Sequence, residues 1–70
     1  DLEIFAPAHE TITSKNETLF IELKLNKGKL SPNQVSIRDS LVSAGFPWAL
    51  CRSVEEVETF LNKYIKLRTA

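Results

Sequence analysis

Residues 18–25 read TLFIELKL, and this alternating stretch sets the architecture of the chain. Side chains at every second position of a β-strand share one face, so the alternation predicts a strand with one face toward a core. The predicted core face carries Leu19, Ile21, Leu23 and Leu25, and the opposite face carries Thr18, Phe20, Glu22 and Lys24. The second face is chemically mixed, because it holds a carboxylate and an ammonium group.

A shorter strand is predicted at residues 2–6, where branched and aromatic side chains precede Pro7. The polar residues 8–17, which include Ser14, Lys15 and Asn16, predict a hairpin loop between the two strands. The two strands should therefore pair in antiparallel fashion.

A helix is predicted to begin at Pro32. Residues 26–29 break the preceding strand, and Ser31 and Gln34 are spaced as the two halves of a capping box. Gly45 stands where a glycine cap usually ends a helix. The predicted core side of this helix comprises Val35, Ile37, Leu41, Val42 and Ala44.

A third strand and a second helix complete the predicted order. The apolar residues 48–51 are typical of a strand covered on both faces. Ser53 and Glu56 repeat the capping-box spacing and open the last helix, which is expected to end in Lys63, Lys66 and Arg68. Its expected core residues are Val54, Val57, Leu61, Tyr64 and Ile65. The chain is thus predicted to be an α/β protein with a mixed sheet and the order β-β-α-β-α.

Composition narrows the class of protein. Seventy residues with 43% hydrophobic content form one domain, residues 1–70, near the lower limit for a stable core. Nine basic residues balance nine acidic ones, so contact with DNA would need a local basic patch. Cys51 and His9 are single, which excludes an internal disulfide and a zinc cluster and favours an intracellular protein. The longest apolar run, residues 46–51, is too short to cross a bilayer, and no export signal is recognised.

Glu22 and Lys24 are two residues apart on the predicted strand and therefore share a face. Asp1 heads the preceding strand and approaches Glu22 if the two strands pair. Two adjacent carboxylates are costly without a cation, and oxygen ligands without His or Cys favour Mg²⁺. We therefore predict a magnesium site formed by Asp1, Glu22 and the backbone carbonyl of Leu23. The alternative is an ordinary charge pair on a solvated strand face.

In this hypothesis Lys24 orients a water molecule and stabilises charge on a scissile phosphate, so that a phosphodiester is hydrolysed without histidine. Lys27 and Lys29 flank Gly28 and would contact phosphates, or else belong to a solvated turn. Arg52 would bind a phosphate or have only a surface or capping role. Trp48 would stack on a base or, as is more usual for a tryptophan in such an apolar run, lie in the core.

The same segments resemble the VRR-NUC family of PD-(D/E)xK nucleases over nearly the whole chain. Asp1 and Leu2 resemble the end of the PD motif, and residues 21–24 resemble the (D/E)xK motif. Residues 27–34 are similar to the glycine, Leu-Ser-Pro and Gln segment that follows the lysine in this family, and residues 44–53 are similar to its final strand and helix start.

The resemblance implies a restriction-endonuclease-like fold and an Mg²⁺- or Mn²⁺-dependent nuclease that acts on DNA, in some members branched DNA and as a homodimer. It adds Gln34 to Asp1, Glu22 and Lys24 as an active-site residue, although the capping box alone also explains this glutamine. The family has a helix and a strand before the PD motif, so the resemblance implies further sequence before residue 1. Two other functions stay open: an interaction module without catalysis, and a nuclease-like domain that binds DNA without cutting it.

Overall fold

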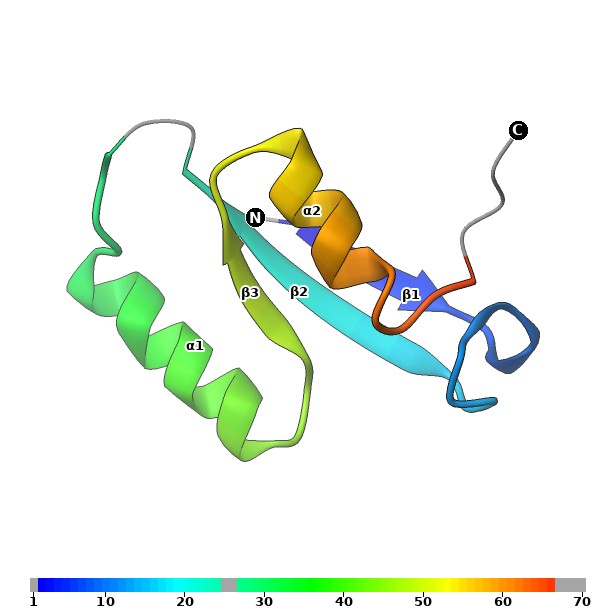
Figure 1. Ribbon diagram of the computed structural model, residues 1–70. Coiled ribbons are helices and arrows are strands. Elements are labelled where there is room, and N and C mark those ends of the chain that lie inside the picture. Colours follow the sequence, from blue (N-terminus) through cyan, green and yellow to red (C-terminus); the bar gives the residue numbers. More distant parts are fainter. Residues whose placement is uncertain (1, 25–26, 67–70) are drawn as a thin grey trace.

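The computed structural model describes residues 2–24 and 27–66, which form a three-stranded mixed sheet with two α-helices (Figure 1). In chain order the elements are β1 (Leu2–Ala6), the short 3-10 helix η1 (Ala8–Glu10), β2 (Glu17–Leu23), α1 (Pro32–Ser43), β3 (Trp48–Cys51) and α2 (Val54–Leu61). The predicted α/β class and the order β-β-α-β-α are confirmed. Over these same residues, neither helix has the length and apolar character needed to cross a membrane.

The sheet has the strand order β1-β2-β3. β1 runs antiparallel to β2, with Leu2 opposite Ile21, and β2 runs parallel to β3, with Glu22 beside Leu50. Parallel strands end at the same edge of a sheet, so the connections after β2 and after β3 leave from one carboxyl edge (Figure 1). This edge brings together the segments that hold most of the predicted site.

The core lies between the sheet and α2. Leu19 and Ile21 of β2 are buried together with Cys51 of β3 and Phe60 of α2. The predicted core face of β2 is confirmed at these two residues. Leu23 is 38% exposed because it lies at the end of the strand, and Leu25 lies outside the described residues.

Helix α1 lies alongside the edge strand β3 and buries none of its side chains (Figure 1). Its predicted core side is therefore wrong in part: Ile37 and Val42 are exposed, whereas Leu41 is half-buried. Ala44 is also exposed, because the helix ends at Ser43. Val35 is half-buried. Within the described residues, nothing buries the predicted core side of α1.

The predicted glycine cap after α1 is confirmed. Gly45 has a φ of 89°, and its N–H donates to the carbonyl of Val42 while the N–H of Phe46 donates to that of Leu41. These two bonds form a Schellman motif, which satisfies the last carbonyl groups of the helix.

Helix α2 is shorter than predicted and ends at Leu61. The backbone of the next residues pairs instead with the end of η1 and the segment after it. The N–H of Ile12 donates to the carbonyl of Tyr64, and the N–H of Lys66 donates to the carbonyl of Glu10. Lys63 and Lys66 therefore do not lie on a helix, and Arg68 lies outside the described residues. The prediction that Val54 is a core residue is also wrong, since it is 73% exposed at the first position of the helix.

The segment before β2 is more ordered than a simple hairpin loop. Thr11 is fully buried, and its hydroxyl donates to the carbonyl of Lys15 at 2.7 Å and accepts from the N–H of the same residue at 3.2 Å. A threonine that satisfies nearby backbone groups in this way stabilises a turn. The turn holds the start of β2 opposite the end of β1.

Candidate active site

Glu22 lies at the carboxyl edge of β2, on the side of the sheet that α1 covers. Its neighbour Ile21 points into the core under α2, so alternation turns Glu22 the other way. The residue is only 9% exposed. The amide Nε2 of Gln34 donates to Glu22 Oε1 at 3.0 Å, which joins the strand to the first turn of α1.

The capping box of α1 fixes the position of Gln34. The backbone N–H of Gln34 donates to Ser31 Oγ at 3.2 Å, and Gln34 Oε1 accepts from the backbone N–H of Ser31 at 2.9 Å. The side-chain amide is thus bound at both ends, by the helix cap and by Glu22. The predicted capping role of Gln34 is confirmed, and the same geometry directs its amide toward the carboxylate of Glu22.

The second carboxylate oxygen of Glu22 remains open to solvent. Oε2 has no hydrogen-bond partner among residues 2–24 and 27–66, and no polar side-chain atom in this part of the chain is both buried and unpartnered. One oxygen is therefore held by protein, and the other can accept a ligand.

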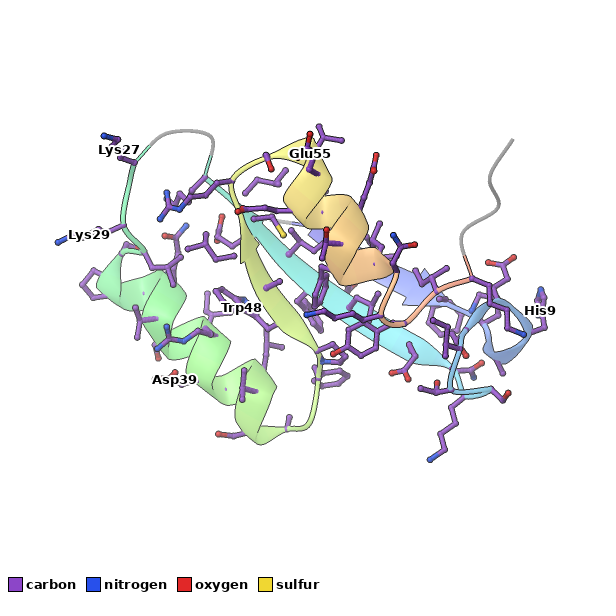
Figure 2. All side chains as sticks on the ribbon, viewed as in Figure 1. His9, Lys27, Lys29, Asp39, Trp48 and Glu55 are labelled. Carbon is purple, nitrogen blue, oxygen red and sulfur yellow. The ribbon has the colours of Figure 1, made fainter. Side chains whose placement is uncertain are left out.

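A small pocket of about 60 Å³ adjoins this carboxylate. Its polar groups are Glu22 and Gln34, and its apolar lining comes from the sheet and from α1: Leu2, Phe20, Ile21, Ile37, Leu41 and Trp48. Trp48 is half-buried, and its ring lies 5.9 Å from the guanidinium carbon of Arg38. The tryptophan thus lines the pocket at the interface between β3 and α1 (Figure 2). The sequence favoured a core position for it, with stacking on a base as the alternative.

Lys24 follows β2 and shares the face of Glu22 by alternation. Its backbone N–H donates to the carbonyl of Cys51 at 3.0 Å, so the pairing with β3 continues one residue beyond the strand. The lysine is half-buried, and its ammonium group has no hydrogen-bond or ion-pair partner within the described ranges. The ammonium group is therefore not engaged with Glu22 and is available to an anion.

Asp1 lies outside the described residues. The next residue, Leu2, pairs with Ile21, which directly precedes Glu22. Among residues 2–24 and 27–66, no group of three or more His, Cys, Asp or Glu side chains is arranged to hold a metal ion. The predicted pair of carboxylates includes Asp1, so the predicted metal site stays a prediction.

The basic residues gather at the same edge of the sheet. Lys27 and Lys29 are exposed and project away from the body of the protein, from the connection between β2 and α1 (Figure 2). Arg52 follows β3, and its guanidinium Nη2 donates to the carbonyl of Gly28 at 2.9 Å. The three basic residues that the sequence assigned to phosphate contacts therefore come from the two connections that leave this edge of the sheet.

Comparisons with protein-family models, with curated proteins and with solved structures gave no match for this chain. The sequence predicted Glu22, Lys24 and Gln34 as site residues, but it assigned Ser31 only to the helix cap. The capping-box spacing was the signal for its position, and the bond from Gln34 to Glu22 gives it a place in the site.

Proposed function

We propose that the chain is a metal-dependent deoxyribonuclease of the VRR-NUC type that its sequence resembles. The observation that carries the proposal is the state of Glu22: its carboxylate is nearly buried, has one neutral hydrogen-bond donor and keeps one oxygen open. A buried charge is costly unless it is paired. A divalent cation at the open oxygen would offset that cost.

The donor set fits a hard cation. Glu22, Asp1 and the carbonyl of Leu23 would hold Mg²⁺ or Mn²⁺, because these ions prefer oxygen ligands and Mg²⁺ often takes only one or two carboxylates beside water and phosphate. When bound, the ion supplies a Lewis acid that activates water and neutralises charge on phosphate.

The remaining residues act on the substrate through charge and position. Lys24 lies on the face of Glu22 and would stabilise the negative charge that develops on the scissile phosphate. Gln34 holds the carboxylate in place. The exposed Lys27 and Lys29 would bind backbone phosphates without regard to sequence.

A homodimer forms part of the proposal. Several large apolar side chains are exposed in the described chain, and such surfaces often mark interfaces between proteins. They include Phe5, Ile37, Val42 and Phe46. Sedimentation of wild type and of Ile37→Glu would test whether the side that carries α1 mediates dimerisation. Action on DNA would also agree with the intracellular location expected from the cysteine content.

The decisive experiment measures cleavage of branched and linear DNAs with Mg²⁺ and with Mn²⁺ by wild type, Lys24→Ala and the control Lys15→Ala. Lys15 is exposed in the turn before β2. We expect Lys24→Ala to reduce the rate by about 10²- to 10³-fold and Lys15→Ala to leave it unchanged, since loss of one positioned electrostatic group typically has this effect. Circular dichroism would show that both variants are folded.

A second measurement tests the metal directly. Binding of Mn²⁺, followed by electron paramagnetic resonance, should be lost in Glu22→Gln and retained in Glu58→Gln, an exposed position on α2. Salt-sensitive DNA binding without cleavage would favour a domain that binds but does not cut. The absence of both cleavage and metal binding in wild type would favour a non-catalytic interaction module.

A further inference from the structure

Arg52 connects two loops that are far apart in the sequence. Its guanidinium donates to the carbonyl of Gly28, which lies 24 positions earlier in the chain. The two loops meet because β2 and β3 are parallel and end at the same edge of the sheet. The bond therefore depends on the tertiary fold and links the start of α2 to the loop before α1.

Local hydrogen bonds at the start of α2 hold the backbone of Arg52. The N–H of Arg52 donates to the carboxylate of Glu56, and the N–H of Glu56 donates to Ser53 Oγ at 3.1 Å. Ser53 thus caps α2 through its hydroxyl, while the Glu56 side chain binds the N–H of the residue before the cap. Arg52 thus extends from a rigid helix start, and a charged donor on such a base gives a strong and directional hydrogen bond.

Gly28 stands between Lys27 and Lys29, whose side chains project outward (Figure 2). A hydrogen bond to the central carbonyl restrains the backbone that carries both lysines. Ordering a loop before binding removes an entropic cost that the ligand would otherwise have to offset. We infer that Arg52 is a positioning residue, which holds the loop of residues 27–29 so that its two lysines meet the phosphates of DNA together.

This inference rests on the proposed function for its DNA ligand, and a double-mutant cycle tests it. The affinity for a labelled duplex, measured by fluorescence anisotropy with EDTA present, is compared among wild type, Arg52→Gln, Lys27→Gln/Lys29→Gln and the triple variant. Lys63→Gln, in the turn after α2, serves as the matched charge control.

If Arg52 acts through the loop, Arg52→Gln weakens binding by about tenfold in the wild-type background, the scale of one restrained loop. In the background that lacks both lysines, the same substitution changes binding by less than about twofold, because there is nothing left to position. An equal effect of Arg52→Gln in both backgrounds would show a direct phosphate contact and overturn the inference. Arg52→Lys keeps the charge but lacks the forked donor, so it should lose most of the same affinity.

A measurement without DNA separates this inference from the proposed function. In the free protein, the backbone order parameters of Gly28 and Lys29 from nitrogen-15 relaxation should fall in Arg52→Gln and stay unchanged in Lys63→Gln. Unchanged values in Arg52→Gln would refute the positioning role. A fall in order without any DNA binding by wild type would confirm the restraint on the loop but refute both its phosphate ligand and the proposed nuclease.

Discussion

Replacement of Gln34 by glutamate separates the two hydrogen bonds that its side chain makes. A glutamate at this position keeps an oxygen for the N–H of Ser31, so the capping box can persist. It removes the donor that lies 3.0 Å from Glu22 and puts a second carboxylate there. The substitution therefore tests the contact with Glu22 and leaves the helix cap in place.

The expected cost follows from the geometry. A hydrogen bond to a charged group contributes about 1.5–3 kcal/mol, and two like charges about 4 Å apart near a protein surface repel by up to about 4 kcal/mol. Residue 34 is half-buried, so the new carboxylate can rotate partly into solvent and reduce this repulsion. We expect Gln34→Glu to lower the free energy of unfolding by about 2–3 kcal/mol at about pH 7.

Urea unfolding followed by the fluorescence of Trp48 measures this change, because the tryptophan lines the pocket beside Glu22 and Gln34. Like charges raise the pKa of one carboxyl group of the pair, so lowering the pH protonates it and restores a donor. At least half of the lost stability should return at about pH 5. Ser31→Ala, which removes only a cap, should cost about 1 kcal/mol without this pH dependence. A Gln34→Glu variant as stable as Ser31→Ala at both pH values would refute the reasoning.

Three further predictions concern the framework of the site. Burial, and then the nearby Glu56, raise the pKa of the Cys51 thiol above its usual 9.0, so the folded state keeps a proton that the unfolded state loses. Stability from this residue is present below about pH 9 and lost above it, so the difference in unfolding free energy between wild type and Cys51→Ala should shrink as pH rises. Gly45→Ala should lower the free energy of unfolding, measured by thermal denaturation, by about 1–2 kcal/mol. This cost comes from the positive φ alone, because a Cβ at this position meets nothing within 4 Å. Gly45→Asn should cost less. Thr11→Val should cost about 1–3 kcal/mol because it leaves backbone groups of Lys15 unpaired, whereas Thr59→Val, at an exposed position on α2, should cost less than about 0.5 kcal/mol.

Local signals in the sequence predicted the elements well. The capping box at Ser31, the N-cap at Ser53, the proline at the start of α1 and Gly45 at its end act within a few residues, so they do not depend on the rest of the fold. The predicted capping box at Ser53 is only half formed, because the Glu56 side chain accepts from the N–H of Arg52 and not from that of Ser53. The alternation of residues 18–25 likewise placed Leu19 and Ile21 in the core and turned Glu22 away from it.

Contacts between distant residues were not predictable in the same way. Helix α2 ends early because residues 64–66 pair with the segment after η1, and no periodic pattern marks that pairing. The bond from Arg52 to Gly28 requires two parallel strands to end together, which only the assembled sheet provides. The apolar spacing of α1 predicted a buried face, but most of that face has nothing to cover it in the described chain.

The oxygen and the nitrogen of the Gln34 side-chain amide have different roles. One end helps to begin a helix and the other restrains the carboxylate of Glu22. A change at residue 34 therefore alters folding and the site at once, and a change at residue 31 alters the helix start on which residue 34 lies. In a library with both positions randomised, we expect active variants to be recovered as compatible pairs and seldom as independent single substitutions. These two positions should therefore show strong epistasis, in contrast to the exposed positions on the outer side of α1.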